Sequence, residues 1–431
     1  MGTGKSKAIM SIANSDKFGN DSNCRMIIIV PTKDEQKRFL VNCKGFAKPI
    51  ETPFREDIKR LLKEGRNIVT THALCSIMSG DTRKLIKDGK YPYYCWIDEQ
   101  PNFVRNIVGG YTKFSFDDNG NKEGIERFSA NDLRLAQNNK ILSYDKETKV
   151  IHYASGNEYD ITDNKPGVFQ AFKEYDDIAD MFNYGKNSKD ENLINTIIAL
   201  TKKEVFSVFK EVWVCSYMVR DSLLQNYCDF NNIGLDFYHV ENDNFIKGYK
   251  ELYPINLDRL VVVDDTKLLS DESLTKSCFA KDLKNSKVIM KSLSNKMRTF
   301  KTLYKVKSKD LYWTCFSDYH KELAKINSRN VPIRRYVPCN IKATNEYRNC
   351  HFVAYLCNRM INPNLSHFFE SKDIVFDNNL YALSELIQVI WRSNIRVADS
   401  TDKVYVYIPN RRMRELFKDW LAKGIALQKN T

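Results

Sequence analysis

The sequence predicts an α/β fold with parallel sheets, and three buried strands with polar ends carry that prediction. Continuous apolar runs at 25–30, 67–70 and 93–97 have the composition of strands that are buried on both faces. Each run ends in polar residues, and residues 7–15, before the first run, have the apolar spacing of a helix. Alternating strands, polar ends and helices are typical of a parallel sheet covered by helices.

The N-terminal stretch Gly2-Thr3-Gly4-Lys5-Ser6 matches the second half of a phosphate-binding loop. In such a loop, backbone N–H groups surround phosphates, a lysine reaches the β- and γ-phosphates, and a hydroxyl binds Mg²⁺. Lys5 and Ser6 fit the last two roles, and the glycines keep side chains away from the phosphates. Taken alone, the motif also fits a plain surface turn.

The first half of this pattern is not in the sequence. The full G-x-x-x-x-G-K-[ST] pattern requires another glycine five residues before Gly4, and a buried strand before that. Because this strand is central in such a sheet, its absence should remove hydrogen-bond partners from two neighbours. We therefore expect that the reading frame begins upstream, that a separate fragment supplies the strand, or that the chain is impaired.

The run at 93–97 ends in Asp98 and Glu99. The carboxyl ends of parallel strands are where open α/β folds bind ligands. Phosphoryl transfer to water requires one carboxylate to hold Mg²⁺ and another to orient or deprotonate the water. Asp98 suits the first task and Glu99 the second. The alternative is a solvated acidic pair at the end of a strand.

Together these motifs resemble a known enzyme family. With V-P-T-K-D-E-Q at 30–36 and T-T-H-A-L at 70–74, they resemble motifs I, Ia, Ib and II of superfamily 2 helicases, the DEAD/DEAH-like nucleic-acid-dependent ATPases. Weaker similarities cover the later motifs: motif III at 213–218 with Ser216, motif IV at 311–317, motif V at 343–348 and motif VI at 384–396. The sequence at 405–414 looks most like helicases of large tailed bacteriophages.

The resemblance implies two RecA-like lobes, residues 1–234 and 235–431. The first lobe would lack its first strand and would carry an α+β insertion at about 103–205. ATP and Mg²⁺ would bind in the cleft between the lobes, and hydrolysis would drive a helicase or translocase in phage replication or recombination.

Gln388, Arg392 and Arg396 are the candidates from the second lobe. On a continuous helix they stand at i, i+4 and i+8 and share one face, while Leu383, Leu386, Ile387 and Ile390 would face the core. The resemblance implies that the arginines act as arginine fingers on the nucleotide. Motif VI usually has a glycine where Trp391 stands, and an exposed basic face is the alternative.

A nucleic-acid partner agrees with the composition. The net charge is +13 and the sequence pI is about 9.0, and basic surfaces gain affinity by releasing counterions from phosphates. Codon bias in an AT-rich genome is an alternative cause. We expect contacts to the backbone of single-stranded DNA rather than RNA, from these residues: Thr32, Thr71, Thr344 and Asn345.

The insertion contains a predicted β-hairpin, 141–144 with 150–153, and a predicted helix at about 192–210. It could separate strands as a pin, or serve as a passive domain or partner-binding surface. In the second lobe, Asp264 and Asp265 could form a second magnesium site, but we favour a surface turn.

Eleven cysteines show no C-x-x-C spacing, which favours reduced thiols packed as small hydrophobic residues. The N-terminus has no apolar core of the length that a signal peptide requires, and no apolar run approaches the ~20 residues that cross a bilayer. We therefore expect a soluble cytoplasmic protein without a membrane partner.

Two other functional classes remain open. A packaging-motor ATPase shares the phosphate loop and the acidic pair but should carry an acidic C-terminal nuclease, whereas this C-terminus is basic. A non-catalytic nucleic-acid-binding protein descended from a helicase would explain the incomplete phosphate loop.

Overall fold

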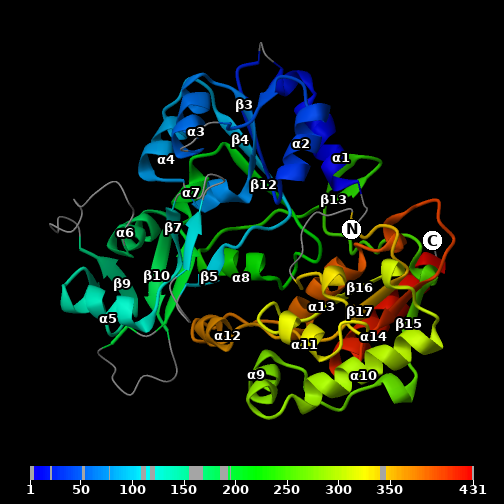
Figure 1. The fold of residues 1–431 in the computed structure, drawn as a ribbon. Helices are drawn as coiled ribbons and strands as arrows, with labels where there is room; N and C mark the ends of the chain where they lie inside the picture. The colour runs from blue at the N-terminus through cyan, green and yellow to red at the C-terminus, as the bar shows by residue number, and fades with distance from the viewer. Residues whose placement is uncertain are drawn as a thin grey trace. The chain divides into compact units, whose positions relative to one another are not determined.

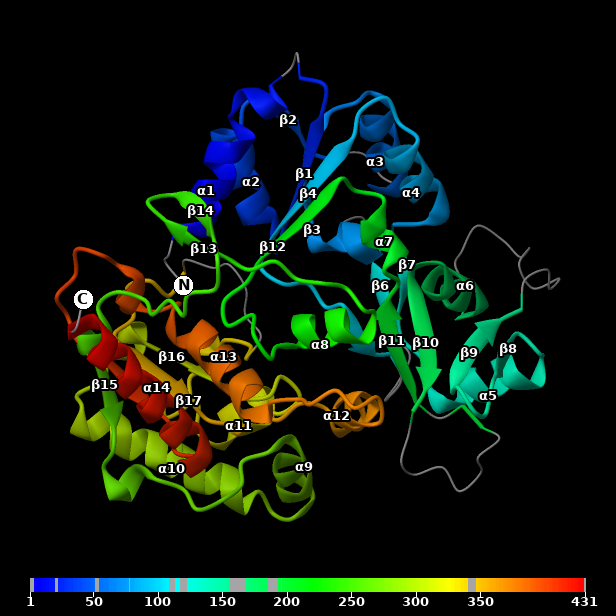
Figure 2. The same cartoon turned by 180° about the vertical axis from the view of Figure 1, so that it is seen from behind.

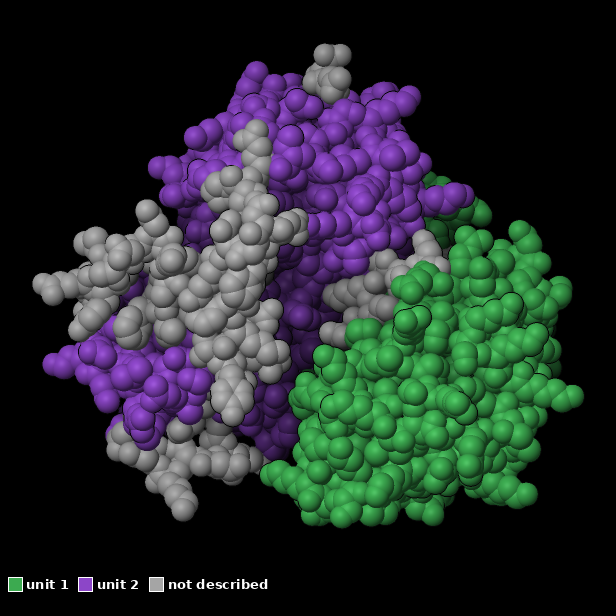
Figure 3. All heavy atoms as spheres, in the orientation of Figure 1, with its two compact units in different colours: residues 1–4, 237–361, 377–431 green, residues 5–236, 362–376 purple. Residues whose placement is uncertain are grey.

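The computed structural model describes residues 4–19, 22–50, 54–76, 78–107, 113–116, 122–154, 168–184, 193–194, 196–339 and 346–429. Four predicted site residues lie outside these ranges: Gly2, Thr3, Thr344 and Asn345. The chain forms two compact units, coloured separately in Figure 3. Unit 2 comprises Lys5–Asp236 and Asn362–Phe376, and unit 1 comprises Met1–Gly4, Phe237–Ile361 and Asp377–Thr431.

The main sheet of unit 2 consists of five parallel strands in the order β12-β4-β1-β3-β2. The strands are β1 (Arg25–Val30), β2 (Phe46–Ala47), β3 (Asn67–Thr71), β4 (Tyr93–Asp98) and β12 (Glu211–Cys215). Every residue of β1 is buried, as an apolar run in a sheet covered on both faces must be. The three predicted strands and the α/β class are confirmed.

Helices cover both faces of this sheet. Figures 1 and 2 show α1 (Lys5–Ala13) and α2 (Lys33–Asn42) on one face, and α3 (Phe54–Lys63) and α4 (Gly80–Lys87) on the other. The remaining helices of this part are the short η1 (Asp16–Phe18), η2 (His72–Ser76) and α7 (Glu204–Ser207), and α8 (Leu223–Phe230).

Each described strand of the main sheet pairs directly with the next strand in the sheet. We had expected that the absent first strand would leave a gap between two neighbouring strands. β12 pairs in parallel directly with β4, from Glu211 opposite Tyr94 to Cys215 opposite Asp98. Among the described strands, β12 is therefore an edge strand, and the expectation that two neighbouring strands lose their partners is wrong. The sequence motifs alone do not specify the order of strands across a sheet.

Unit 2 also contains an antiparallel sheet in the order β5-β11-β10-β9-β8. Its strands are β5 (Val104–Asn106), β8 (Leu142–Tyr144), β9 (Val150–Tyr153), β10 (Ala179–Asn183) and β11 (Ile197–Thr201). The elements that accompany it are α5 (Ala130–Asn138), α6 (Val168–Ile178) and the β6–β7 hairpin (Lys113–Phe116 with Lys122–Arg127). The predicted insertion is thus an α+β layer, and its predicted hairpin is β8 with β9.

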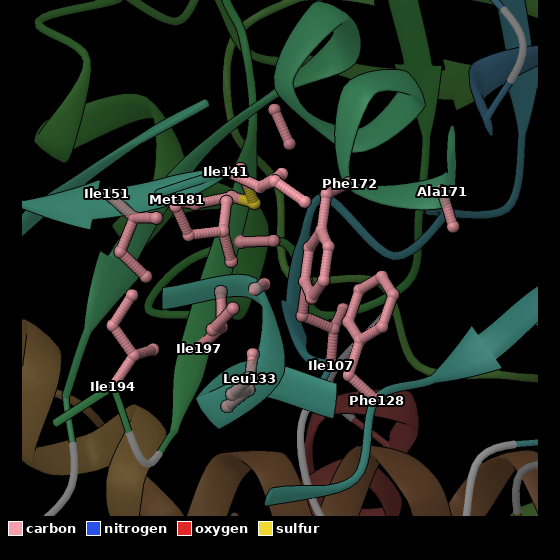
Figure 4. Packing of buried hydrophobic residues seen from close by; sticks show 14 of the residues in the cluster. Ile107, Phe128, Leu133, Ile141, Ile151, Ala171, Phe172, Met181, Ile194 and Ile197 are labelled. Atoms are coloured by element: carbon pink, nitrogen blue, oxygen red, sulfur yellow. The ribbon is translucent and has the colours of Figure 1, made fainter. Parts of the chain in front are cut away.

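A separate hydrophobic core holds this insertion together (Figure 4). Phe128 and Phe172 stack with ring centroids 3.9 Å apart, and both are fully buried. Ile197 belongs to the same core, in β11. The predicted helix at 192–210 is therefore wrong: the described part contains β11 and only a four-residue helix, because the apolar run 197–200 fills a central strand position.

The segment 362–376, which the sequence analysis placed in the second lobe, packs within unit 2. Its helix α12 (Pro363–Glu370) puts Phe368 against Phe182 and Phe230, with ring centroids 5.1 and 5.4 Å away. The Tyr184 hydroxyl also donates to the carbonyl of His367 at 2.8 Å.

The sheet of unit 1 consists of four parallel strands in the order β15-β18-β17-β16. These are β15 (Leu260–Val263), β16 (Leu311–Thr314), β17 (Phe352–Tyr355) and β18 (Val404–Tyr407). The other elements of unit 1 are the hairpin β13–β14 (Tyr238–Glu241 with Asn244–Lys247), the short helices η4 (Leu257–Arg259), η5 (Thr266–Leu268), η6 (Ser308–Asp310), η7 (Ile333–Arg335) and η8 (Asn394–Arg396), and the helices α9 (Lys276–Lys284), α10 (Val288–Leu303), α11 (His320–Ile326), α13 (Asn378–Ile390) and α14 (Arg411–Lys429).

Aromatic residues attach helices to the two faces of this sheet. On one face, Phe300 of α10 stacks on Tyr407 of β18, with ring centroids 4.9 Å apart. On the other, the hydroxyl of Tyr312 in β16 donates to the carbonyl of Val389 in α13 at 2.7 Å. Since Tyr312 and Tyr407 belong to alternate registers of the ladder, α10 and α13 cover opposite faces.

A buried arginine fixes the loop that follows α13. Arg259 is 4% exposed, and its guanidinium donates to the carbonyls of Asp402, Val397 and Asn394 at 2.9–3.1 Å and to the side chain of Asn394. These acceptors lie on the chain that contains η8, so one side chain holds that segment against β15.

Replacing Arg259 should therefore destabilise unit 1. We expect Arg259→Ala to lower the free energy of unfolding by about 3 kcal/mol, because several buried carbonyls lose a charged donor. Urea denaturation of the purified chain measures this change. Lys403→Ala is the control, because exposed Lys403 makes one hydrogen bond, to the carbonyl of Asp258; it should change stability by less than about 0.5 kcal/mol. Equal losses for both variants would contradict a special role for Arg259.

Candidate functional site

The carboxyl ends of β1, β3, β4 and β12 lie at one edge of the main sheet of unit 2. Parallel pairing forces this, because strands in register end together: Val30 stands opposite Thr71, and Cys215 opposite Asp98. The predicted residues of this unit all belong to this edge or to the helices that start there: Lys5, Ser6, Thr32, Thr71, Asp98 and Glu99.

Ser6 and Asp98 form the centre of the site. The Ser6 hydroxyl, in the first turn of α1, donates to Oδ2 of Asp98 at 2.9 Å. Ninety-two residues separate the two in sequence, and the parallel sheet brings them together. A hydroxyl and a carboxylate are hard oxygen ligands of the kind that Mg²⁺ accepts while it keeps several waters. The donor set therefore fits the predicted magnesium site.

Burial and charge act in opposite directions on Asp98. The residue is only 5% exposed, and burial raises the pKa of its carboxyl group above the ordinary value. The positive charge of Lys5 and the hydrogen bond from Ser6 lower that pKa, while the neighbouring Glu99 raises it. A bound cation at this position would supply the charge that a buried carboxylate requires.

The start of α1 supplies the groups that a phosphate needs. Gly4 has a φ angle of +80°, a left-handed conformation that glycine adopts without strain. The helix then begins at Lys5, so its first N–H groups and the positive end of its dipole are at the same edge as Asp98. Helix N-termini of this kind bind anions.

Glu99 has an unusual backbone conformation. Its φ angle is +65°, which is uncommon outside glycine and asparagine. Its N–H donates to the carbonyl of Cys215 at 3.0 Å, so the turn that follows β4 is fixed to the end of β12. A left-handed backbone at a glutamate is a local cost, and it lies directly beside Asp98.

Thr32 and Thr71 lie at the ends of the two neighbouring strands. The Thr32 hydroxyl caps α2 by accepting from the N–H of Glu35 at 3.2 Å, and its own proton can still be donated to another acceptor. Thr71 is the last residue of β3 and is half-buried. Both predicted nucleic-acid contacts are thus at the edge where Asp98 lies, and the contacts themselves stay a prediction.

Three side chains at this edge were missed by the sequence analysis. His72 has Nε2 3.3 Å from the carbonyl of Asp98, and the charge of Arg38 lowers the pKa of Asp98. Gln36 donates to the carbonyl of Val69 at 2.8 Å and so ties α2 to β3. Gln36 and His72 belong to the motifs at 30–36 and 70–74, and Arg38 follows the first motif by two residues. Their position shortly after a predicted strand was the signal in the sequence that could have identified them.

The predicted helical face of Gln388, Arg392 and Arg396 is wrong. Helix α13 ends at Ile390, so only Gln388 belongs to it, and Arg396 is the last residue of the separate short helix η8. Ser393 ends the helix because its hydroxyl donates to the carbonyl of Ile390 at 2.7 Å and competes with helical hydrogen bonding. The apolar face of α13 is as predicted, with Leu383, Leu386, Ile387 and Ile390 buried.

The two arginines have different surroundings in unit 1. Arg392 is 5% exposed, and its charge reaches the buried phenol of Tyr312, whose pKa burial raises. Arg396 is exposed. Of the two, only Arg396 reaches the surface of the unit.

The acidic pair after β15 lies in the short connection between β15 and η5. The Asp265 carboxylate caps η5 by accepting from the N–H of Lys267 at 2.9 Å. Asp264 pairs with Lys418 at 2.6 Å and with Arg414 at 3.4 Å. Both carboxylates are thus used within unit 1.

None of the helices in the described part of the chain is long and apolar enough to cross a membrane.

Comparisons with known proteins agree with a phage origin but assign no activity. The chain is 28% identical over 448 residues to the SPbeta prophage-derived uncharacterized protein YonV of Bacillus subtilis (strain 168), an alignment that covers 98% of this chain and 97% of that protein. Residues 253–421 match the model of the YonV C-terminal Rossmann-like domain. That match spans the four-stranded sheet of unit 1.

Solved structures of XPD helicases are only distantly similar. The structure titled "Structure of S. tokodaii Xpd4" has a TM-score of 0.44 and 13% sequence identity, covering 97% of this chain and 92% of that one. A second, titled "XPD_Helicase", has a TM-score of 0.43 and 10% identity, covering 98% and 94%. Similarity at this level carries no argument about mechanism, which has to come from the site.

The buried Asp98 predicts a pH-dependent stability effect. Because the pKa of Asp98 is raised in the folded state, its ionised form disfavours folding at neutral pH. Asp98→Asn should therefore raise the melting temperature at pH 7. The gain should shrink as the pH falls through the raised pKa and vanish below the ordinary aspartate value of 3.8.

Differential scanning calorimetry at several pH values measures this effect. Asp399→Asn, which removes an exposed carboxylate, is the matched control and should leave the melting temperature nearly unchanged. A lower melting temperature for Asp98→Asn at pH 7 would show instead that Lys5 and Ser6 more than offset the burial.

Proposed function

We infer that the chain is a Mg²⁺-dependent ATPase that acts on nucleic acid, a helicase or translocase of the superfamily 2 type. The hydrogen bond between Ser6 and Asp98 is the observation that supports this most. It joins the hydroxyl of a G-K-S motif to the acid that begins a D-E motif, at the end of a helix that can bind phosphate.

The proposal gives each residue of this edge a task. Lys5 and the first N–H groups of α1 bind the β- and γ-phosphates of ATP. Ser6 and Asp98 would hold Mg²⁺, and the ion would supply positive charge against the negative charge that develops on the phosphates. Glu99, whose backbone N–H is held by the carbonyl of Cys215, orients or deprotonates the attacking water.

Thr32 and Thr71 supply backbone contacts to the nucleic acid in this proposal. Hydroxyls at the ends of strands bind phosphates without reading sequence. Arg396, exposed on unit 1, is the candidate arginine finger, a group that can contribute a factor of about 10³ in rate. Arg392 is buried, so we assign it a structural role in unit 1.

A substitution at Glu99 distinguishes the binding of ATP from its hydrolysis. We expect Glu99→Gln to bind ATP and Mg²⁺ with an affinity within about threefold of the wild type, because the amide keeps the shape and the polar contacts. Turnover should fall by at least about 10²-fold, because an amide cannot accept a proton from water. Steady-state phosphate release and equilibrium binding of a fluorescent ATP analogue measure the two quantities.

Glu147→Gln provides the control, since Glu147 is exposed in the turn between β8 and β9. It should leave both quantities unchanged. Wild-type turnover in Glu99→Gln would remove that residue from the water-activating role. Nucleic-acid binding without any ATP binding in the wild type would favour the non-catalytic alternative.

A further inference from the structure

Most of the net positive charge of the chain comes from one short segment of unit 1. Between residues 276 and 309 there are eleven lysines and arginines and a single acid, Asp282, which gives +10 of the total of +13. The basic residues are Lys276, Lys281, Lys284, Lys287, Lys291, Lys296, Arg298, Lys301, Lys305, Lys307 and Lys309. This segment contains α9 and α10, which Figure 1 shows along one side of the sheet of unit 1.

The fold directs these charges to solvent. One face of α10 is apolar and buried against the sheet, through Met290, Leu293, Met297 and Phe300. Lys291 and Arg298 are exposed on the opposite face, where Ser292, Asn295 and Thr302 are also exposed. Seven residues separate Lys291 from Arg298, so they stand on nearly the same line of the helix about 10 Å apart.

The single acid of the segment does not neutralise this face. Asp282 is 4% exposed, and its two carboxylate oxygens accept from the N–H groups of Ile289 and Met290, each at 2.9 Å. It therefore caps α10 from the end of α9 and fixes the two helices to each other. Such a cap also satisfies donors at the positive end of the α10 dipole.

Two acids of the neighbouring chain are paired with other lysines. Glu322 of α11 binds Lys287 and Lys325 at 2.8 and 2.6 Å, and Asp318 binds Lys276 at 2.7 Å. By contrast, seven exposed basic residues of the segment make no side-chain hydrogen bond or ion pair with the described part of the chain: Lys281, Lys284, Lys291, Arg298, Lys305, Lys307 and Lys309. We call the first five, which lie on the two helices or directly after α10, the α9–α10 basic surface.

We propose that the α9–α10 basic surface binds the sugar-phosphate backbone of a nucleic acid. Unpaired cations bind phosphates with a gain from counterion release, and the neighbouring hydroxyl and amide groups are the other usual backbone ligands. The five residues include no aromatic ring for stacking and no acid that would select a base. Binding is therefore independent of the base sequence. This proposal does not depend on the proposed ATPase activity.

The same surface does not suit a membrane. An amphipathic helix that binds lipid inserts its apolar face, but the apolar face of α10 is already buried in the core of unit 1. The exposed apolar residues do not form one stripe: Leu283 lies near the end of α9, and Val288 and Leu303 are the first and last residues of α10. Charge without an insertable face fits a soluble polyanion better.

The test compares two double variants with the same change in net charge. Lys291→Glu/Arg298→Glu reverses two charges of the surface. Lys84→Glu/Lys423→Glu reverses two exposed lysines, on α4 and α14, that likewise make no side-chain contact with described residues. Fluorescence anisotropy without nucleotide then measures affinity for a labelled oligothymidylate of about 20 nucleotides and for a duplex, at several salt concentrations.

We expect the surface variant to bind roughly tenfold or more weakly, with a salt slope smaller by about two, because each replaced cation no longer neutralises a phosphate. The control variant should stay within about twofold of the wild type, and both should show wild-type circular dichroism. Equal weakening in both variants would mean that total charge alone acts, and unchanged binding in both would place the nucleic acid elsewhere. Loss of binding to phosphatidylserine vesicles with unchanged oligonucleotide affinity would also overturn the proposal.

Discussion

The parallel pairing of β1, β3, β4 and β12 is the constraint on which the candidate site depends. The carboxyl ends of parallel strands lie at the same edge of the sheet. The pairing of the strands therefore brings together residues from distant parts of the chain. Ser6 and Asp98, 92 positions apart, come within hydrogen-bond distance because α1 and β4 both have an end at this edge. The apolar runs hold the strands in the sheet, because every residue of β1 is buried.

Burial of Asp98 connects stability with function. A carboxylate that is 5% exposed disfavours folding in its ionised form, and Lys5 and Ser6 offset that cost only in part, because the pKa stays raised. A site that keeps such a group gains a ligand with strong affinity for a divalent cation. The positive φ of Glu99 in the next position adds a second local cost at the same place, which is where functional sites store strain.

The sequence predicted the three strands of unit 2 well, because a continuous apolar run followed directly by polar residues is typical of a buried parallel strand that ends at the sheet edge. It failed where tertiary context decides. Ser393 ends α13 through its own hydroxyl, so spacing alone could not show that Arg392 and Arg396 leave the helix. The run 197–200 became a strand because the insertion supplies β10 and β5 as partners. The order of strands, with β12 beside β4, was equally invisible in the motifs.

The central claim is that Ser6 and Asp98 hold a divalent cation together with a nucleoside triphosphate. Electron paramagnetic resonance with Mn²⁺, which accepts the same oxygen ligands as Mg²⁺, tests it most directly. With a non-hydrolysable ATP analogue, we predict one protein-bound Mn²⁺ that shows hyperfine coupling to phosphorus, and Asp98→Asn should abolish this signal. A bound ion without phosphorus coupling, or coupling unaffected by Asp98→Asn, would contradict the account.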